Sequence, residues 1–182
     1  VSRLALFIGN IEFEDIRIKS DEFSYIKEMG TTHDGTEVPF RQLPVLDIDG
    51  VIVAQTGAIA RYCGKLGGLY PTNNPIQAAK IDQIIDFATD INLLLGPSRT
   101  ESDPNKREKL RKELAVDGFP KAFNYLEKLL ENNNFEKWFV GENISIADIA
   151  IWRLMGWLTS GMIDHIPTDL LNLFPLLTKL CS

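Results

Sequence analysis

The fold of this chain is decided by the stretch Gln42-Leu43-Pro44-Val45-Leu46-Asp47-Ile48-Asp49-Gly50-Val51-Ile52-Val53-Ala54-Gln55-Thr56. Two apolar runs, 45–48 and 51–54, flank an Asp-Gly pair, which is a strong short-range signal for a β-hairpin. A hairpin brings its outer ends together. We therefore predict a hairpin whose open end carries Leu43-Pro44 beside Gln55-Thr56.

Leu43-Pro44 can expose backbone groups to a ligand. Proline cannot donate to a sheet ladder, so Pro44 marks the edge or the start of a strand. About 5–6% of X-Pro bonds in folded proteins are cis, and a cis bond here would turn the N–H and C=O of Leu43 outward. An extended peptide could then pair with Leu43 as an added strand. The alternative is a proline that only begins a strand, which is the commoner use of this dipeptide.

Gln55-Thr56 begins a helical pattern, whose apolar stripe is Ile59, Ala60, Cys63 and Leu66. The Thr56 hydroxyl and the first free amides of this helix would meet a carboxylate where the helix dipole favours negative charge. Alternatively, Thr56 only caps its own helix. Because the hairpin delivers Gln55 to the same end as Leu43, the two dipeptides together predict a site for a small anionic peptide.

The charge balance argues against nucleic acid as a partner. The 182-residue chain has a net charge of -6, and phosphate binding relies on clustered Lys and Arg. Basic residues gather in one stretch, at Lys106, Arg107, Lys109, Arg111 and Lys112. Glu108 and Glu113 lie among them, which favours a solvated helix face.

The two cysteines, Cys63 and Cys181, lie far apart and form no CxxC or metal-ligand spacing. This predicts free thiols in a reducing, cytoplasmic compartment. His33 and His165 have no partners at a spacing typical of a metal site or a catalytic triad, so we predict no metal. No apolar run approaches the length of a membrane span.

The composition changes near residue 72, where we predict a domain boundary. Before it, we expect a helix over 1–8 ending at Gly9-Asn10, a strand over 13–18, and irregular polar residues over 19–41. Short strands mixed with helices predict an α/β domain.

After Pro75 the pattern is helical throughout. We predict one helix from Pro75 to about Gly96, and a second over 104–132 that bends near Gly118-Phe119-Pro120. A third starts at Ser145, where Asp148 completes a capping box. A further helix begins at Phe174, and no helix-terminating residue follows it in the sequence.

Residues 42–70 resemble the glutathione-binding half of the cytosolic glutathione transferases, most closely in the style of the sigma class. Arg3-Leu4-Ala5-Leu6 resembles the end of that family's first helix, and Ser145-Ile146-Ala147-Asp148 resembles the capping box of its sixth. The resemblance implies an α/β thioredoxin-like N-terminal domain at 1–71 and an all-α domain at 76–182. It also implies that the first strand and the C-terminal end lie outside this sequence.

The resemblance assigns residues to a glutathione site. Leu43-Pro44 would pair with the cysteinyl part through the Leu43 backbone, flanked by Gln42. Gln55 and Thr56 would hold the γ-glutamyl group. Asp90 would reach the γ-glutamyl amine of the partner subunit, although on its own it is an ordinary exposed helix carboxylate.

Phe23 and Lys27 match the family's Trp-x-x-x-Lys pair around the glycyl carboxylate, with phenylalanine lacking the indole donor. The family activates the thiol with a Tyr or Ser hydroxyl, or uses a Cys in some classes. The resemblance places this residue before Val1, so we expect no catalytic residue within the sequence. Tyr25, Tyr62 and Tyr70 are not candidates for that role.

The electrophile site has candidates by position alone: Asn92, Leu95, Gly96 and Ser98. Trp152 and Trp157 are expected in the core and not as a ligand platform. The capping box of Ser145 and Asp148 is expected to be structural.

The resemblance implies a cytoplasmic homodimer that conjugates glutathione to small hydrophobic electrophiles in detoxification, with no cofactor beyond this co-substrate. Two alternatives stay open. One is a non-catalytic structural or binding protein with the same fold, and the other is a thiol transferase or glutathione-dependent isomerase. Fold resemblance does not separate them, because function depends on the site.

Overall fold

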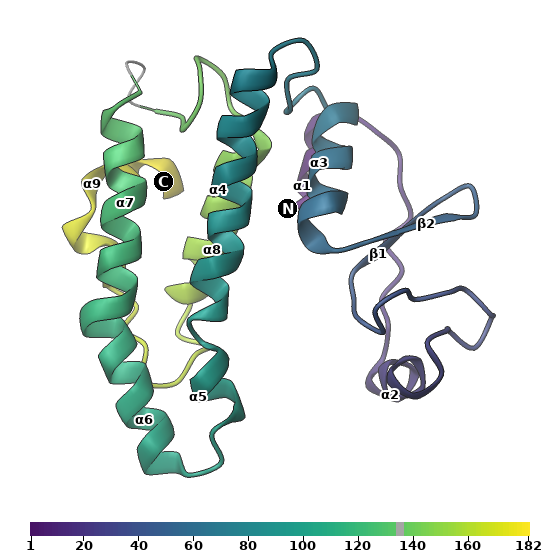
Figure 1. The fold of residues 1–182 in the computed structure, drawn as a ribbon, viewed down its shortest axis with the longest axis horizontal. Coiled ribbons are helices and arrows are strands. Elements are labelled where there is room, and N and C mark those ends of the chain that lie inside the picture. Colours follow the sequence, from purple (N-terminus) through teal and green to yellow (C-terminus); the bar gives the residue numbers. More distant parts are fainter. Residues whose placement is uncertain (134–136) are drawn as a thin grey trace. The chain divides into compact units, whose positions relative to one another are not determined.

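The computed structural model describes residues 1–133 and 137–182. Its internal contacts divide the chain into two compact units, Val1–Tyr70 and Pro71–Ser182 (Figure 1). Within the described residues, none of the helices combines the length and the apolar character needed to span a bilayer.

The first unit contains a short hairpin and three helices: α1 (Ser2–Ile8), α2 (Ser20–Met29), β1 (Val45–Ile48), β2 (Val51–Ala54) and α3 (Thr56–Leu66). Helix α1 packs against α3 (Figure 1). Two glycines allow this close approach, because a Cβ on Gly9 would lie 2.4 Å from the Gly67 Cα. Ala5, Ile59 and Cys63 form the core between the two helices.

The predicted hairpin is confirmed. β1 and β2 are antiparallel, with Val45 opposite Ala54 and Ile48 opposite Val51. Asp49 and Gly50 both have positive φ, 51° and 86°, as a tight turn with the twist of the flanking strands requires.

Two predictions for the first unit are wrong. The segment 13–18 is not a strand, because no described segment pairs with it and its apolar side chains are not gathered on a buried face; Phe13 is 42% exposed and Ile16 70%. The region 19–41, which we expected to be irregular, contains the helix α2. Its apolar stripe is thin, since Ile26 is its only buried residue. The sequence does mark both ends of this helix: Asp21 and Glu22 lie in its first turn, and a glycine, Gly30, follows its last residue with a φ of 82°.

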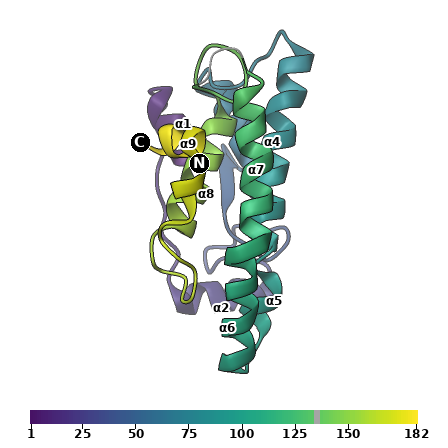
Figure 2. The ribbon, with the colours of Figure 1, turned by 90° about the vertical axis from the view of Figure 1, so that its left-hand side faces the viewer.

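Every described element of the second unit is helical: α4 (Pro75–Leu93), α5 (Gly96–Thr100), α6 (Pro104–Glu113), a π-helical turn (Leu114–Gly118), α7 (Phe119–Glu131), α8 (Ile146–Leu158), a 3-10 turn (Leu170–Leu173) and α9 (Pro175–Cys181). Helix α4 packs mainly on α8, and α7 packs on α9. Figure 2 shows α6 and α7 following one another as a single column. The π-helical turn lies where we predicted a bend, and such turns distort helices.

Capping residues explain where these helices begin. The Asn74 side chain accepts from the Gln77 amide at 3.1 Å, and the Asp103 carboxylate accepts from the Asn105 amide at 2.9 Å. Each is followed by a proline at the first helical position, where its missing N–H costs nothing.

The predicted capping box of α8 is confirmed, and it is buried. Asp148 is 1% exposed, and its carboxylate accepts from the Ser145 amide and hydroxyl, both at 2.7 Å, and from the Phe139 amide at 2.8 Å. Burial raises the pKa of the Asp148 carboxyl, while these hydrogen bonds act in the opposite direction.

Two side chains predicted to be in the core are exposed instead. Leu66, at the last position of α3, is 47% exposed, and Trp152 on α8 is 45% exposed. Helical spacing places a residue on a face, but a neighbouring element must cover that position before the residue is buried.

Candidate functional site

The candidate site lies at the open end of the hairpin in the first unit. Since Val45 pairs with Ala54, the next residue outward on each strand is Pro44 and Gln55. The Leu43-Pro44 peptide bond is cis, the arrangement that the sequence left open beside the commoner strand-entry proline. Gln42 and Leu43 are exposed. The structure thus brings the two predicted dipeptides to the same end of the sheet.

The N-terminus of α3 is open to a ligand. Gln55 precedes the helix with φ 73° and makes no side-chain cap hydrogen bond. Thr56 is exposed and is the first helical residue, so the alternative that it serves as the cap is wrong. The free amides and the dipole of this helix end favour an anion.

The backbone of Gln55 is strained. A positive φ in a non-glycine residue costs on the order of 1–3 kcal/mol and is most often found at active sites and ligand clamps. Among the described residues, no hydrogen-bond partner engages the side chains of Gln42, Gln55 or Thr56. These polar groups are therefore available to a ligand.

Phe23 and Lys27 lie one turn apart on α2. The Lys27 Nζ is 5.0 Å from the centroid of the Phe23 ring, a cation–π distance. Within the described residues, Lys27 makes no ion pair. An ammonium held over an aromatic ring is suited to a carboxylate, although this ring has no polar group of its own.

Arg41 is a residue that sequence reasoning missed. Its Nη1 donates to the carbonyls of Lys27 at 3.2 Å and Glu28 at 2.9 Å, at the C-terminal end of α2. Its backbone has φ 51°. The one signal in the sequence is its place directly before Gln42.

The candidates of the second unit differ in exposure. Asp90 is exposed on α4. Leu95 and Ser98 are 1% and 0% exposed, and the Ser98 hydroxyl donates to the Leu95 carbonyl at 2.9 Å. Asn92 and Gly96 are half-buried, and Asn92 accepts a hydrogen bond from Arg99 at 3.0 Å. Leu95 and Ser98 therefore belong to the interior of the unit, and a ligand would meet Asn92 or Gly96 first.

The two histidines lie beside acidic residues. The His33 ring pairs with the Glu22 carboxylate and stacks on Tyr25 with 4.0 Å between ring centroids. Hydrogen bonds from His33 lower the pKa of Glu22. The His165 Nε2 lies 3.8 Å from the Asp164 Oδ2. No cluster of three or more potential metal ligands occurs in the described part of the chain.

The cysteines are not activated. Burial raises the pKa of Cys63, and burial raises the pKa of Cys181 to about 11. Since the thiolate is the reactive form, neither thiol has the character of a nucleophile at neutral pH.

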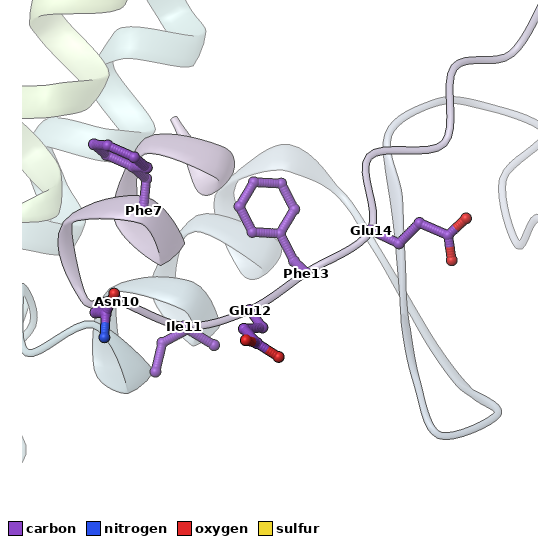
Figure 3. Close-up of a pocket in the computed structure, with 6 residues that line it drawn as sticks. All are labelled: Phe7, Asn10, Ile11, Glu12, Phe13 and Glu14. Atoms are coloured by element: carbon purple, nitrogen blue, oxygen red, sulfur yellow. The ribbon is translucent and has the colours of Figure 1, made fainter.

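A shallow pocket lies elsewhere in the first unit. It is lined by Phe7, Asn10, Ile11, Glu12, Phe13 and Glu14 (Figure 3). None of the residues predicted to bind glutathione lines it. Phe7 extends from α1, whereas the other five follow one another along the extended chain after that helix. This pocket is not the predicted site.

Comparisons with known proteins concern the family and the fold of the chain. Residues 89–182 match the family model described as "Glutathione S-transferase, C-terminal domain". The chain is 33% identical over 153 residues to glutathione S-transferase 1 of Ascaris suum, covering 82% of this chain and 69% of the relative. It is 29% identical over 148 residues to the hematopoietic prostaglandin D synthase of Gallus gallus, covering 81% and 67%.

The fold is shared with solved structures. A prostaglandin synthase D of Nilaparvata lugens superposes with a TM-score of 0.82 at 28% identity, covering 98% of this chain and 82% of that one. This similarity confirms the predicted fold class, in which a thioredoxin-like domain precedes an all-helical domain.

Proposed function

Because this chain belongs to the glutathione S-transferase family, a family of transferases, we propose that the open end of its hairpin binds glutathione and that the protein conjugates it to small hydrophobic electrophiles. The observation that carries the proposal is that the hairpin places the exposed Leu43 and the uncapped N-terminus of α3 at the same end of the sheet. One offers backbone groups, and the other offers donors to a carboxylate. Glutathione has both an extended backbone and terminal carboxylates.

The binding residues have distinct roles in this proposal. The Leu43 backbone pairs with the cysteinyl unit, and Gln42 lies next to it. Gln55 and Thr56 hold the γ-glutamyl carboxylate, with the helix dipole adding to their hydrogen bonds. Together these contacts place the thiol at a fixed position.

The remaining roles are extensions of the same proposal. Lys27, over Phe23, attracts the glycyl carboxylate. Asp90 approaches the γ-glutamyl amine of a partner subunit in a homodimer. Asn92 and Gly96 border the electrophile, with Leu95 and Ser98 behind them in the interior. The hydroxyl that favours the thiolate, a form that is scarce at neutral pH for a thiol of pKa about 8.5, stays a prediction. So do the cytoplasmic location and the role in detoxification.

A second candidate is glutathione-dependent isomerisation. It is favoured by the similarity to two prostaglandin D synthases, one from Gallus gallus and one from Nilaparvata lugens. Formation of prostaglandin D by the purified protein, in the presence of glutathione, would support it.

The experiment that tests the main proposal is steady-state conjugation of glutathione to an activated aryl chloride. We expect Gln55→Ala to raise the KM for glutathione about tenfold or more, because a hydrogen bond to a charged group contributes roughly 1.5–3 kcal/mol. The exposed Gln83 on α4 supplies a control variant, Gln83→Ala, which should leave the KM unchanged. Identical glutathione saturation in Gln55→Ala and in the parent protein would refute the proposed clamp. Glutathione binding without turnover, in a protein that carries the expected thiol-activating hydroxyl, would favour the non-catalytic alternative.

A further inference from the structure

Arg41 connects the two parts of the first unit that we assign to the glycyl and the cysteinyl units of glutathione. On one side, its guanidinium donates to the carbonyls of Lys27 and Glu28 in the last turn of α2. On the other side, its own backbone continues directly into Gln42 and Leu43. A single residue thus links the helix that we assign to the glycyl unit to the segment that we assign to the cysteinyl unit.

The guanidinium satisfies groups that the helix itself cannot satisfy. The last four carbonyls of an α-helix have no intrahelical donor, and a cation is favoured at that end by the helix dipole. Helix α2 ends at Met29, and the next residue, Gly30, has a φ of 82° that turns the chain away from the helix. Arg41 then supplies donors to two of the free carbonyls, and one of them belongs to Lys27 itself.

The loop between α2 and Arg41 is closed by backbone hydrogen bonds. The Val38 amide donates to the Gly30 carbonyl at 2.8 Å, and the Arg41 amide donates to the Val38 carbonyl at 2.9 Å. Val38 is 2% exposed, so the loop is anchored in the unit. The backbone of Arg41 is therefore fixed relative to the end of α2, and its side chain adds a second link.

The conformation of Arg41 shows that this link has a cost. Its φ of 51° lies in the left-handed region, which glycine adopts more easily. An arginine occupies a position where glycine would fit the backbone better. The guanidinium is the group that glycine would not provide.

We propose that Arg41 is a positioning residue, which sets the placement of Lys27 and Phe23 relative to Leu43 and so determines how well the glycyl unit of glutathione is recognised. This inference rests on the proposed function. It predicts that Arg41 affects the glycyl end of the ligand and leaves the γ-glutamyl end at Gln55 and Thr56 unaffected.

The test is isothermal titration calorimetry with two ligands, glutathione and γ-glutamylcysteine, which lacks the glycyl unit. The variant Arg41→Gly removes the guanidinium and suits the positive φ, so the backbone is not strained. We expect the Kd for glutathione to rise about threefold to tenfold, the range typical of indirect coupling, and the Kd for γ-glutamylcysteine to stay unchanged. Arg17→Ala, at an exposed arginine of the same unit, is the control and should change neither Kd.

A second arm separates positioning from direct contact with the ligand. If Arg41 acts through Lys27, then Arg41→Gly should have little further effect on the glutathione Kd in a Lys27→Gln background. Independent, additive effects of the two changes would contradict positioning. Hydrogen exchange of the α2 amides should also be faster in Arg41→Gly without any ligand, which a pure ligand contact would not produce.

The outcomes distinguish this inference from the proposed function. If the parent protein binds glutathione but Arg41→Gly leaves its Kd unchanged, or weakens both ligands equally, the inference is wrong and the proposed function stands. If the parent protein binds neither ligand, the proposed function fails and this inference fails with it.

Discussion

The buried Asp148 gives the sharpest stability prediction. Its carboxylate accepts three hydrogen bonds, from the amide and hydroxyl of Ser145 and from the amide of Phe139. The variant Asp148→Ala removes all three acceptor contacts at once. It also leaves two backbone amides, those of Ser145 and Phe139, without an acceptor at a site that water does not reach.

The expected magnitude follows from these two amides. A buried donor left unsatisfied costs about 1–3 kcal/mol, so we expect Asp148→Ala to lower the free energy of unfolding by about 4 kcal/mol. For a chain of this size that corresponds to a Tm lower by about 8–16 °C. Ser145→Ala leaves the Asp148 carboxylate in place to accept from both amides and should cost only about 1 kcal/mol, the usual cost of losing an N-cap side chain.

The assay is urea denaturation followed by circular dichroism, with Asp169→Ala as a control at an exposed aspartate of the same unit. We expect the order of loss to be Asp148→Ala, then Ser145→Ala, then the control. A loss below about 1 kcal/mol in Asp148→Ala, or an equal loss in Ser145→Ala, would refute the reasoning, because the unsatisfied amides would then carry no penalty.

Three further predictions concern other parts of the chain. Glu127 is 7% exposed, and its carboxylate accepts from both the Leu176 and Leu177 amides at the start of α9. Glu127→Gln should therefore lower the free energy of unfolding by about 1–2 kcal/mol in the same urea assay and speed hydrogen exchange in α9. Burial raises the pKa of Cys181 to about 11, so its neutral thiol contributes stability that is complete below a pH of about 8.5 and is lost as the pH rises through about 11. Iodoacetamide should therefore label the native protein slowly at pH 7.5 and the urea-unfolded protein rapidly. Equal labelling rates would contradict this prediction. Gly50→Ala, at a φ of 86° with open space around it, should lower stability by about 1–2 kcal/mol through the backbone alone, and an unchanged urea midpoint would show that the turn relaxes.

The parts of the fold that could be predicted from the sequence are those that local chemistry determines. The Asp-Gly turn fixes the hairpin, because both positions need positive φ. The capping box fixes the start of α8 through contacts only three residues apart. The bend signal at Gly118 and Pro120 likewise located the π-helical turn that joins α6 to α7.

The parts that could not be predicted depend on tertiary neighbours. The alternation over 13–18 resembles a strand, but a strand also needs a partner, and that partner is not set by local sequence. Helix α2 buries only Ile26, so hydrophobic periodicity could not identify it. Its end depends on Arg41, whose link to Lys27 spans a loop and has no local sequence pattern. The exposure of Trp152 is a further case, since the spacing alone placed it in the core.

The most direct measurement of the central claim is the mapping of glutathione onto the backbone amides by NMR. Titration of the isotope-labelled protein should shift the amide resonances of Leu43, Gln55 and Thr56 most, in parallel and with a single Kd. The amides around Phe7 and Phe13, which line the pocket of Figure 3, should move little. If the largest shifts arise in that pocket, or if no amide at the open end of the hairpin responds to saturating glutathione, the proposed site is wrong.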